Sequence, residues 1–446
     1  MQFHTLNSIV DTFFTVLQFF DHITWTYIAV PAIISFGLLL SYKASWFQII
    51  KFPKIFSIFI NFLKIGDSET VRGIRPLNAF FAAIGGCMGI SNIISVCTAV
   101  QIGGPGALFW IWVAAFLGMI VKYGEIYLGV KYRVAGADNT YNGGPMYYLK
   151  AVDPSGWLST VFCIAMCVYG AEIYMFRVMT QTIATGWSIS PLIVIPMLLC
   201  AIIWAGQHGI DQVGKISSVL IPLFLCGFTC ISFVIFFNNF EKLIEIFGLI
   251  FKHAFTPHAA VGAFAGSSVL LTMTQGMKRA CYTGDIGIGY ASIIHAESEE
   301  SVPQRQAILG LFGIFIDTIL VCSLTLLLIL VTGLWDQPIS ENIIIATALS
   351  KYIPHIKIVW PLLVFLLGYS SLIAFFVVGK KSASYLWPKY GAKIYTVYAI
   401  TAFLVFSFIG TEAHILTIMS CTGGLLLLIN MYGIFKLRNE ISFSLK

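Results

Sequence analysis

Charge is scarce in this sequence. Of its 446 residues only 10% are charged, against roughly 25% in an ordinary soluble domain, and 58% are hydrophobic. The formal charge of +6 does not indicate a nucleic-acid partner, because the basic residues are spread over many short loops. The composition excludes a soluble globular protein and predicts an all-α protein embedded in a lipid bilayer.

The sequence also lacks the motifs of several enzyme classes. It has no His-Glu-x-x-His zinc helix, its eight histidines are isolated, and no Gly-x-Ser-x-Gly turn occurs. A phosphate-binding Gly-x-x-x-x-Gly-Lys-Ser/Thr loop is absent as well. These absences argue against an intramembrane hydrolase and against ATP-driven transport by this chain. We therefore expect no enzymatic activity and no cofactor.

Clustered cysteines are missing too. The ten cysteines are scattered, and only two pairs, Cys163/Cys167 and Cys226/Cys230, lie four residues apart. This is not the spacing of a metal site or of a short disulfide framework. We interpret the cysteines as buried apolar side chains.

Long apolar segments are what the sequence does have. A helix needs roughly 20 mostly apolar residues to cross a bilayer, and eleven segments qualify: 24–44, 76–101, 105–130, 155–178, 188–208, 214–238, 258–279, 305–334, 356–378, 392–412 and 414–437. Residues 1–23 contain no Lys or Arg and predict an amphipathic surface helix rather than a cleavable signal peptide.

The distribution of Lys and Arg predicts the orientation. If the N-terminus is outside, twenty basic residues fall on the inner side and one, Lys122, falls within a span. Five fall on the outer side: Arg177, Lys242, Lys252, Lys351 and Lys357. Basic residues are retained on the cytoplasmic side, so we expect an outer N-terminus and a cytoplasmic C-terminus.

One predicted span contains glycine residues at its centre, where glycine makes a helix less stable. In "AFFAAIGGCMGISNIISVCTAV" (79–100), Gly85, Gly86 and Gly89 lie at the centre, followed by Ser91 and Asn92. The glycines can form a close helix-packing face. Alternatively, the helix unwinds there and frees backbone groups that an ion and a zwitterion can satisfy. Both interpretations remain open at this point.

A second span favours unwinding. The segment 258–279 carries Gly262, Gly266, Ser267 and Ser268 at its centre, and both glycine-rich spans are followed by four further spans. Two such helices, each opening a five-helix unit, indicate an inverted-repeat secondary transporter with its site at mid-membrane. A passive channel is the alternative from another class, although it has less use for two broken helices.

This pattern divides the chain into five parts. The parts are 1–75 with the surface helix, the first span and a cytoplasmic loop; the first repeat, 76–238; an extracytoplasmic connector, 239–257; the second repeat, 258–437; and a cytoplasmic tail, 438–446.

Several longer motifs resemble a known family. They are "GGPGALFWIWVAAFLGMIVKYGEIYLGVKYR" (103–133), "NGGPMYYL" (142–149), "FIDTILVC" (315–322) and "MKRACYTGDIGIGYASIIHA" followed by Pro303-x-x-Gln306. The chain resembles the alanine or glycine:cation symporter family of bacteria and archaea. The resemblance implies a sodium-coupled, in some members proton-coupled, importer of small neutral amino acids in the cell membrane. It also implies a leucine-transporter-type fold of 5+5 inverted helices with one extra N-terminal helix.

The chain departs from the family pattern at three places. The family's Gly-Thr-Gly-Asn reads Gly89-Ile90-Ser91-Asn92 here, and its Ser-Asn-Glu-Ala-Gly reads Thr283-Gly284-Asp285-Ile286-Gly287. A family Gln-x-Asn matches Met179-x-Gln181. These changes touch positions expected to shape the pocket or a gate, so the family does not fix the substrate.

The resemblance also suggests a sodium site. Ser370 and Ser371 are adjacent hydroxyls at mid-membrane, where this fold class commonly supplies two ligands opposite the carbonyls of Gly85 and Met88. The alternative is that each serine bonds back to its own helix.

The amino acid is expected between the two broken helices. Half-helix ends offer free amides to a carboxylate and free carbonyls to an ammonium group. The expected groups are Gly86, Gly89, Asn92, Gly262, Gly266 and Ser267, with Gln181 from another span. Phe264 either closes over a small side chain or is an ordinary core aromatic residue.

Three carboxylates are candidates for gating or coupling. Asp317 lies inside a span, where it either neutralises the cation or, with Thr318, satisfies the backbone of a broken helix. Glu125 lies three residues after Lys122 and is expected to form a structural ion pair with it. Asp285, in "TGDIGIG", is either part of a cytoplasmic gate or a plain loop residue.

Overall fold

The computed structural model describes residues 2–64, 72–136, 139–256 and 268–444, with side chains from residue 12 onward. This part of the chain is almost entirely helical. Its one small sheet pairs β1 (Val134–Ala135) antiparallel with β2 (Tyr141–Asn142).

The helices of the first half are α1 (Gln2–Ile23), η1 (Thr24–Ala29), α2 (Val30–Lys43), α3 (Phe47–Ile50), α4 (Phe52–Lys64), α5 (Pro76–Cys87), η2 (Ile90–Asn92), α6 (Cys97–Gly103), α7 (Ala107–Lys131), α8 (Pro145–Val152), α9 (Trp157–Tyr169), α10 (Ile173–Trp187), α11 (Pro191–Gln207) and α12 (Gly209–Asn238). Those of the second half are α13 (Phe240–Phe255), α14 (Val269–Gly284), α15 (Tyr290–His295), α16 (Pro303–Ile314), η3 (Phe315–Val321), α17 (Cys322–Thr332), α18 (Glu341–Ser350), α19 (Ile356–Leu386), α20 (Gly391–Phe408) and α21 (Glu412–Lys436). Proline begins α5, α8, α11 and α16, where its missing N–H has no helical partner to lose.

Within the described residues, eight helical segments are long and apolar enough to cross a bilayer. They are Thr12–Lys43, Ala107–Lys131, Trp157–Trp187, Gly209–Asn238, Pro303–Thr332, Ile356–Leu386, Gly391–Phe408 and Glu412–Lys436. A ninth is the bent pair Pro76–Cys87 and Ile90–Gly103. Of the two other expected spans, 188–208 corresponds to the shorter apolar helix α11, and only the part of 258–279 from Ser268 onward is described.

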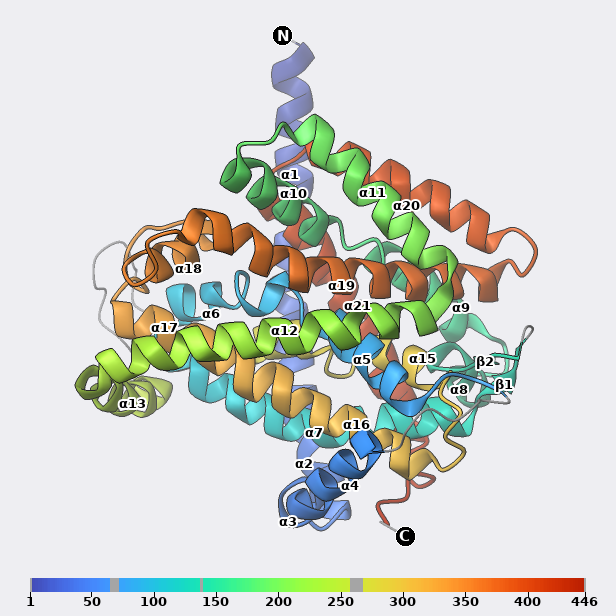
Figure 1. Ribbon diagram of the computed structural model, residues 1–446. Coiled ribbons are helices and arrows are strands. Elements are labelled where there is room, and N and C mark those ends of the chain that lie inside the picture. The colour runs from blue at the N-terminus through green and yellow to red at the C-terminus, as the bar shows by residue number, and fades with distance from the viewer. Residues whose placement is uncertain (1, 65–71, 137–138, 257–267, 445–446) are drawn as a thin grey trace.

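The N-terminal region differs from the sequence prediction. Instead of a surface helix at 1–23 and a separate span at 24–44, α1, η1 and α2 form one uninterrupted helix through a π-helical segment. In Figure 1 this helix stands upright behind the others. Its α2 part packs against α7 and its α1 part against α21.

The remaining long helices form a layered bundle. In Figure 1, α7, α12, α16 and α19 run across the view, with α5 between α12 and the centre of the molecule. Helix α16 packs on α7, and α12 packs on α5 and α19. Most of α19 is buried whereas only a small part of α20 is, so α19 is a central element and α20 a peripheral one.

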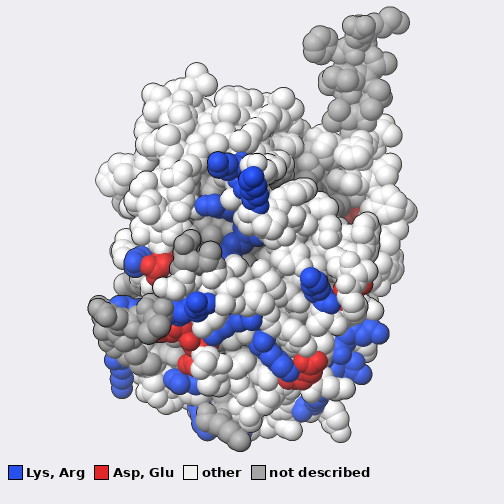
Figure 2. Space-filling view, turned by 90° about the vertical axis from the view of Figure 1, so that its right-hand side faces the viewer, with Lys and Arg blue, Asp and Glu red and all other residues white. Residues whose placement is uncertain are grey.

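One end of the bundle carries many Lys and Arg side chains (Figure 2). Helices α13 and α18 lie at one end, and α8 with the β1–β2 hairpin lies at the other (Figure 1). Figure 2 faces this second end, where Lys and Arg side chains gather over the surface. The face presented to the cytoplasm in the sequence-based orientation is therefore the basic one.

Candidate functional site

The helix that begins at α5 breaks at its central glycines. Helix α5 ends at Cys87, and the segment from Ile90 to Gly103 continues at an angle of 56°. In an uninterrupted helix the N–H of Gly89 would bond to the carbonyl of Gly85. Here it donates instead to Asn92 Oδ1 at 3.0 Å and to Cys87 O at 2.9 Å. The Gly85 carbonyl is therefore released from its own helix.

Two hydroxyls from α19 converge on the released carbonyls. Ser371 Oγ donates to Gly85 O at 2.7 Å and to Met88 O at 3.4 Å. Ser370 Oγ donates to Gly85 O at 3.0 Å and also to Leu367 O of its own helix at 2.8 Å. The expected back-bonding thus applies in part to Ser370, while Ser371 is directed at the break. Two carbonyls and two hydroxyls meet at one buried point, which is a set of hard oxygen ligands.

A second break lies between α14 and α15, at a place that the sequence-based prediction did not name. Gly262, Phe264, Gly266 and Ser267, where the sequence predicts that the second glycine-rich span unwinds, lie outside the described residues. The described chain breaks between α14 and α15, at Asp285–Gly289, where Asp285, Gly287 and Gly289 have φ values of 49°, 74° and 100°. Glycine adopts such left-handed backbone conformations more readily than other residues do. The stretch interpreted either as part of a gate or as a plain loop therefore separates two buried helices.

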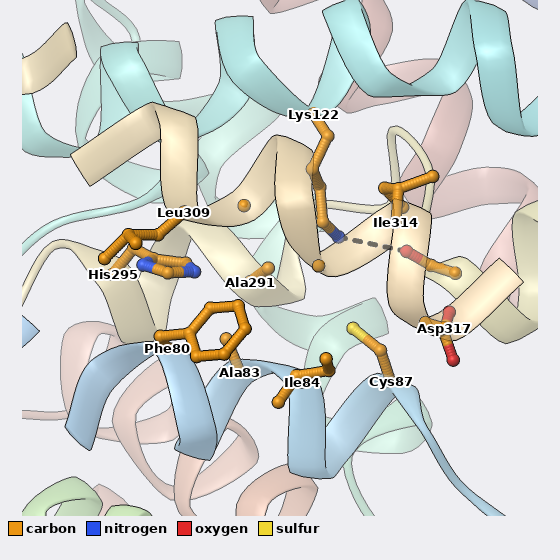
Figure 3. A pocket seen from close by; sticks show the side chains of 13 residues that line it. Phe80, Ala83, Ile84, Cys87, Lys122, Ala291, His295, Leu309, Ile314 and Asp317 are labelled. Carbon is orange, nitrogen blue, oxygen red and sulfur yellow. Dashed lines mark hydrogen bonds between the residues drawn. The ribbon is translucent and has the colours of Figure 1, made fainter. Parts of the chain in front are cut away.

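Lys122 and Asp285 satisfy the backbone of this break. Lys122 Nζ, from α7, donates to the carbonyls of Gly284 at 3.2 Å and Asp285 at 2.7 Å, and to Asp285 Oδ2 at 2.7 Å. Figure 3 shows Lys122 extending from α7 toward this point. Asp285 Oδ2 also accepts from the N–H of Ala291 at 3.0 Å. The Lys122 ammonium group thus lies at the C-terminal end of α14, and the Asp285 carboxylate lies at the N-terminal end of α15. Both charges have the sign that the helix dipoles favour.

Glu125 joins this network from the same face of α7. It lies 3.4 Å from Lys122 Nζ, so the expected ion pair is present, although Lys122 divides its charge between two carboxylates. Glu125 Oε2 accepts from Asn430 Nδ2 at 3.1 Å, and the same amide donates to Gly287 O at 2.9 Å. A second carbonyl of the break is therefore satisfied through Asn430.

Asp317 supports the first break. It lies in the π-helical segment η3, and its carboxylate accepts from Asn92 Nδ2 and from Thr318 Oγ1. Since Asn92 Oδ1 holds the Gly89 N–H, Asp317 acts on the broken backbone through Asn92. This geometry corresponds to the backbone-satisfying alternative. Both halves of the Asn92 amide are occupied, so it is not free to hold a substrate in this conformation.

The two breaks are packed directly against each other. Tyr290 Oη, at the start of α15, donates to Ala82 O at 3.1 Å. A Cβ on Gly86 would lie 1.7 Å from this Oη, and one on Gly89 would lie 2.6 Å from Met175 Cε. Close packing and unwinding, the two alternatives for the glycines, therefore occur together. The neighbouring cavity holds about 20 Å³, room for about one water molecule.

The residues around this cavity come from α5, α7, α14, α15, α16 and η3. In Figure 3, Cys87 of α5 and Asp317 lie close together at one end, while Phe80 and His295 face each other at the other end. A cavity of this volume does not admit an amino acid. The described residues around this cavity therefore leave no space for a substrate between α5, α15 and η3.

Gln181 is not part of this centre. It lies near the middle of α10 and lines a larger cavity of about 590 Å³ between α10, α18 and the start of α19. Its amide lies between Arg177 Nε at 3.2 Å and Glu412 Oε1 at 2.6 Å. The α10 residue that reaches the first break is Met175, which sequence reasoning missed because a methionine in an apolar span carries no signal. Met179 packs against Gly368 of α19.

The sequence profile described as the Sodium:alanine symporter family matches residues 10–446. The chain belongs to this family. Among characterised or named relatives, the sodium/alanine symporter AgcS of Methanococcus maripaludis is 29% identical over 91% of this chain and 90% of its own length. The probable sodium/glutamine symporter GlnT of Bacillus subtilis is 24% identical over 96% of this chain and 88% of its own.

Solved structures agree with this membership at the level of the fold. The transporter MhsT in complex with L-phenylalanine superposes with a TM-score of 0.60 at 11% identity, covering 82% of this chain and 89% of its own. A Na⁺-coupled sialic acid symporter gives 0.59 at 13% identity, covering 93% and 87%. As a sodium:alanine symporter family member, the chain is a multi-pass membrane protein for secondary transport of amino acids, and not an enzyme.

Proposed function

We propose that this protein carries a small neutral amino acid, such as alanine or glycine, into the cell together with sodium, by alternating access. The observation that carries the proposal is the convergence of Ser370 and Ser371 on the carbonyls that the first break releases. Sodium bound there would hold α5 against α19, and the amino acid would bind between the two breaks. Family relatives named as sodium/alanine and sodium/glutamine symporters support the coupling ion.

The proposed architecture has eleven spans, with two inverted units of five and the extra N-terminal helix. The bent pair α5–α6 opens the first unit, and α14–α15, broken at Asp285–Gly289, belongs to the helix that opens the second. The N-terminus would lie outside and the C-terminus in the cytoplasm of a bacterial cell, across its inner membrane. Lys278 and Arg279, which the sequence count placed on the inner side, lie within α14, and the basic excess of the inner side remains without them.

Transport by purified protein in liposomes tests the proposal. We expect an inward sodium gradient to drive accumulation of labelled alanine or glycine above equilibrium, and sodium to stimulate exchange of labelled for unlabelled substrate. Serine uptake under the same gradient would define how large a side chain is accepted. Accumulation driven only by a proton gradient would favour proton coupling, and equilibration without any cation dependence would indicate a channel.

A further inference from the structure

We propose that Glu172, in the turn between α9 and α10, carries a second coupling cation, a proton or a second sodium ion, in addition to the sodium at Ser371. This inference rests on the proposed symport. It starts from a buried carboxylate that the site described above does not use.

The chain is distorted at Glu172. Helix α9 ends at Tyr169 and α10 begins at Ile173, and Glu172 between them has a left-handed φ of 44°. Residues other than glycine and asparagine rarely adopt this conformation, which persists only where the surrounding structure imposes it. The side chain is thus held at a fixed place inside the bundle, next to an interrupted helix.

Glu172 is buried without a partner. It is 2% exposed, and its Oε2 has no hydrogen-bond partner in the described part of the protein. The other buried carboxylates described here, Glu125, Asp285, Glu297 and Asp317, each make an ion pair or a hydrogen bond. An unpaired anion in the apolar interior is strongly disfavoured. Glu172 therefore requires a cation that the described side chains do not provide.

The surroundings supply further oxygen atoms. The phenols of Tyr169, Tyr282, Tyr290 and Tyr395, on α9, α14, α15 and α20, lie within electrostatic range of Glu172. The hydroxyl of Tyr395 also lacks a hydrogen-bond partner within the described residues. Phenol and carboxylate oxygens are hard groups of the kind that bind a proton or sodium.

Further titratable groups lie within electrostatic range of these tyrosines. Asp285 and Cys87 act electrostatically on Tyr290, Arg279 on Tyr282, and Cys167 and Tyr398 on Tyr395. None of the basic residues in the described chain forms an ion pair with Glu172.

Helix α19 connects this position to the sodium site. A Cβ on Gly170 would lie 2.9 Å from the carbonyl of Phe375, so the turn presses on α19 one helical turn beyond Ser371. The Phe375 ring stacks on Tyr290 at 4.1 Å between ring centroids and meets Tyr169 edge-on at 5.5 Å. A change of charge at Glu172 would therefore act on residues that contact both breaks.

The number of charges moved per substrate tests the inference. In proteoliposomes of the wild-type protein, we expect reversal potentials that correspond to two cations per neutral amino acid. If the second cation is a proton, a pH gradient will drive accumulation at equal sodium on both sides. If it is sodium, the reversal potential will follow the square of the sodium ratio and ignore the pH gradient. A wild-type ratio of one overturns the proposal.

Glu172→Gln provides the matched variant. It should lower the ratio from two to one while sodium-stimulated exchange persists, because Ser371 and the breaks are unchanged. Glu297→Gln removes an equally buried carboxylate that is paired with Lys381, and it should leave the ratio at two. A Glu172→Gln protein that still moves two cations per amino acid contradicts the assignment. If this variant does not fold, the number of cations that the wild-type protein moves per amino acid tests the proposal. Absence of sodium-stimulated exchange in the wild type would instead refute the proposed symport.

Discussion

At the scale of single residues, the two adjacent serines of α19 have different surroundings. Ser370 divides its hydroxyl between Gly85 and its own helix, whereas Ser371 is directed at Gly85 and Met88. Ser371→Ala should raise the sodium concentration for half-maximal uptake by about tenfold, which corresponds to ~1.4 kcal/mol. Substrate binding at saturating sodium should change much less. Uptake measured over a range of sodium concentrations checks this expectation.

Ser382→Ala is the matched control for this substitution. Ser382 is equally buried on the same helix, but its hydroxyl donates to Val378 O of its own helix at 3.0 Å. Its removal should leave the sodium dependence unchanged. An equal loss of uptake at every sodium concentration in the Ser371→Ala protein would show that the serine has only a structural role.

Lys122 is the residue on which the second break depends most. Removing one partner of a buried ion pair leaves an uncompensated charge and destabilises a protein by about 3–5 kcal/mol. Lys122→Met should therefore lower the thermal unfolding temperature of the detergent-solubilised protein. Adding Asp285→Asn should restore part of the loss, because the remaining amide has no charge to bury. A double variant less stable than Lys122→Met alone would contradict this account.

At the scale of elements, the contact between α5 and α15 decides whether the two breaks stay together. A Cβ at residue 86 would overlap Tyr290 Oη, so Gly86→Ala should separate the helices and abolish uptake, with insertion into the membrane unchanged. Gly313→Ala is the control, because its Cβ would meet only Phe80 at an ordinary 3.9 Å. Transport assays on membrane-inserted protein compare the two. Normal uptake by Gly86→Ala would show that this close approach is dispensable.

The same elements show how far the sequence predicts the structure. The first break was predictable because its glycines and Asn92 are adjacent in the chain. The break at Asp285–Gly289 was not predicted, because that stretch was interpreted only as part of a gate or as a plain loop, and the unwinding predicted at Gly262–Gly266 lies outside the described residues. What holds the break at Asp285 open is Lys122, which is remote in sequence and comes from another helix. The motif "TGDIGIG", with glycine at the positions of positive φ, was the signal available.

At the scale of the whole molecule, the C-terminal tail is fastened to the basic end of the bundle. Glu440 Oε2 accepts from Lys131 Nζ at 2.7 Å and from Tyr132 Oη at 2.8 Å, and Lys43 Nζ donates to Asn439 Oδ1 at 2.9 Å. The hydrogen bonds from Lys131 and Tyr132 lower the pKa of Glu440. Because the carboxyl pKa is lowered, the contact is fully stabilising at pH values above the ordinary glutamate pKa of about 4. The contact is lost as the pH falls through the lowered pKa.

Limited proteolysis of the tail measures this contact. Cleavage should remain slow at neutral pH and accelerate only in acid below the ordinary glutamate pKa. Glu440→Gln should be cleaved faster at neutral pH, with a weaker dependence on acid. A tail whose cleavage in the wild type does not change with pH would show that Glu440 does not hold it.

The distribution of Lys and Arg predicts the orientation of the whole bundle in the membrane. The end seen in Figure 2 carries many Lys and Arg side chains, and basic residues stay on the cytoplasmic side during insertion. A cysteine replacing exposed Gln337, at the end with α18, should react with an impermeant maleimide in intact cells. One replacing exposed Ser155, after α8, should react only after permeabilisation, with the native chain as the background. The reverse pattern of labelling would contradict the proposed orientation.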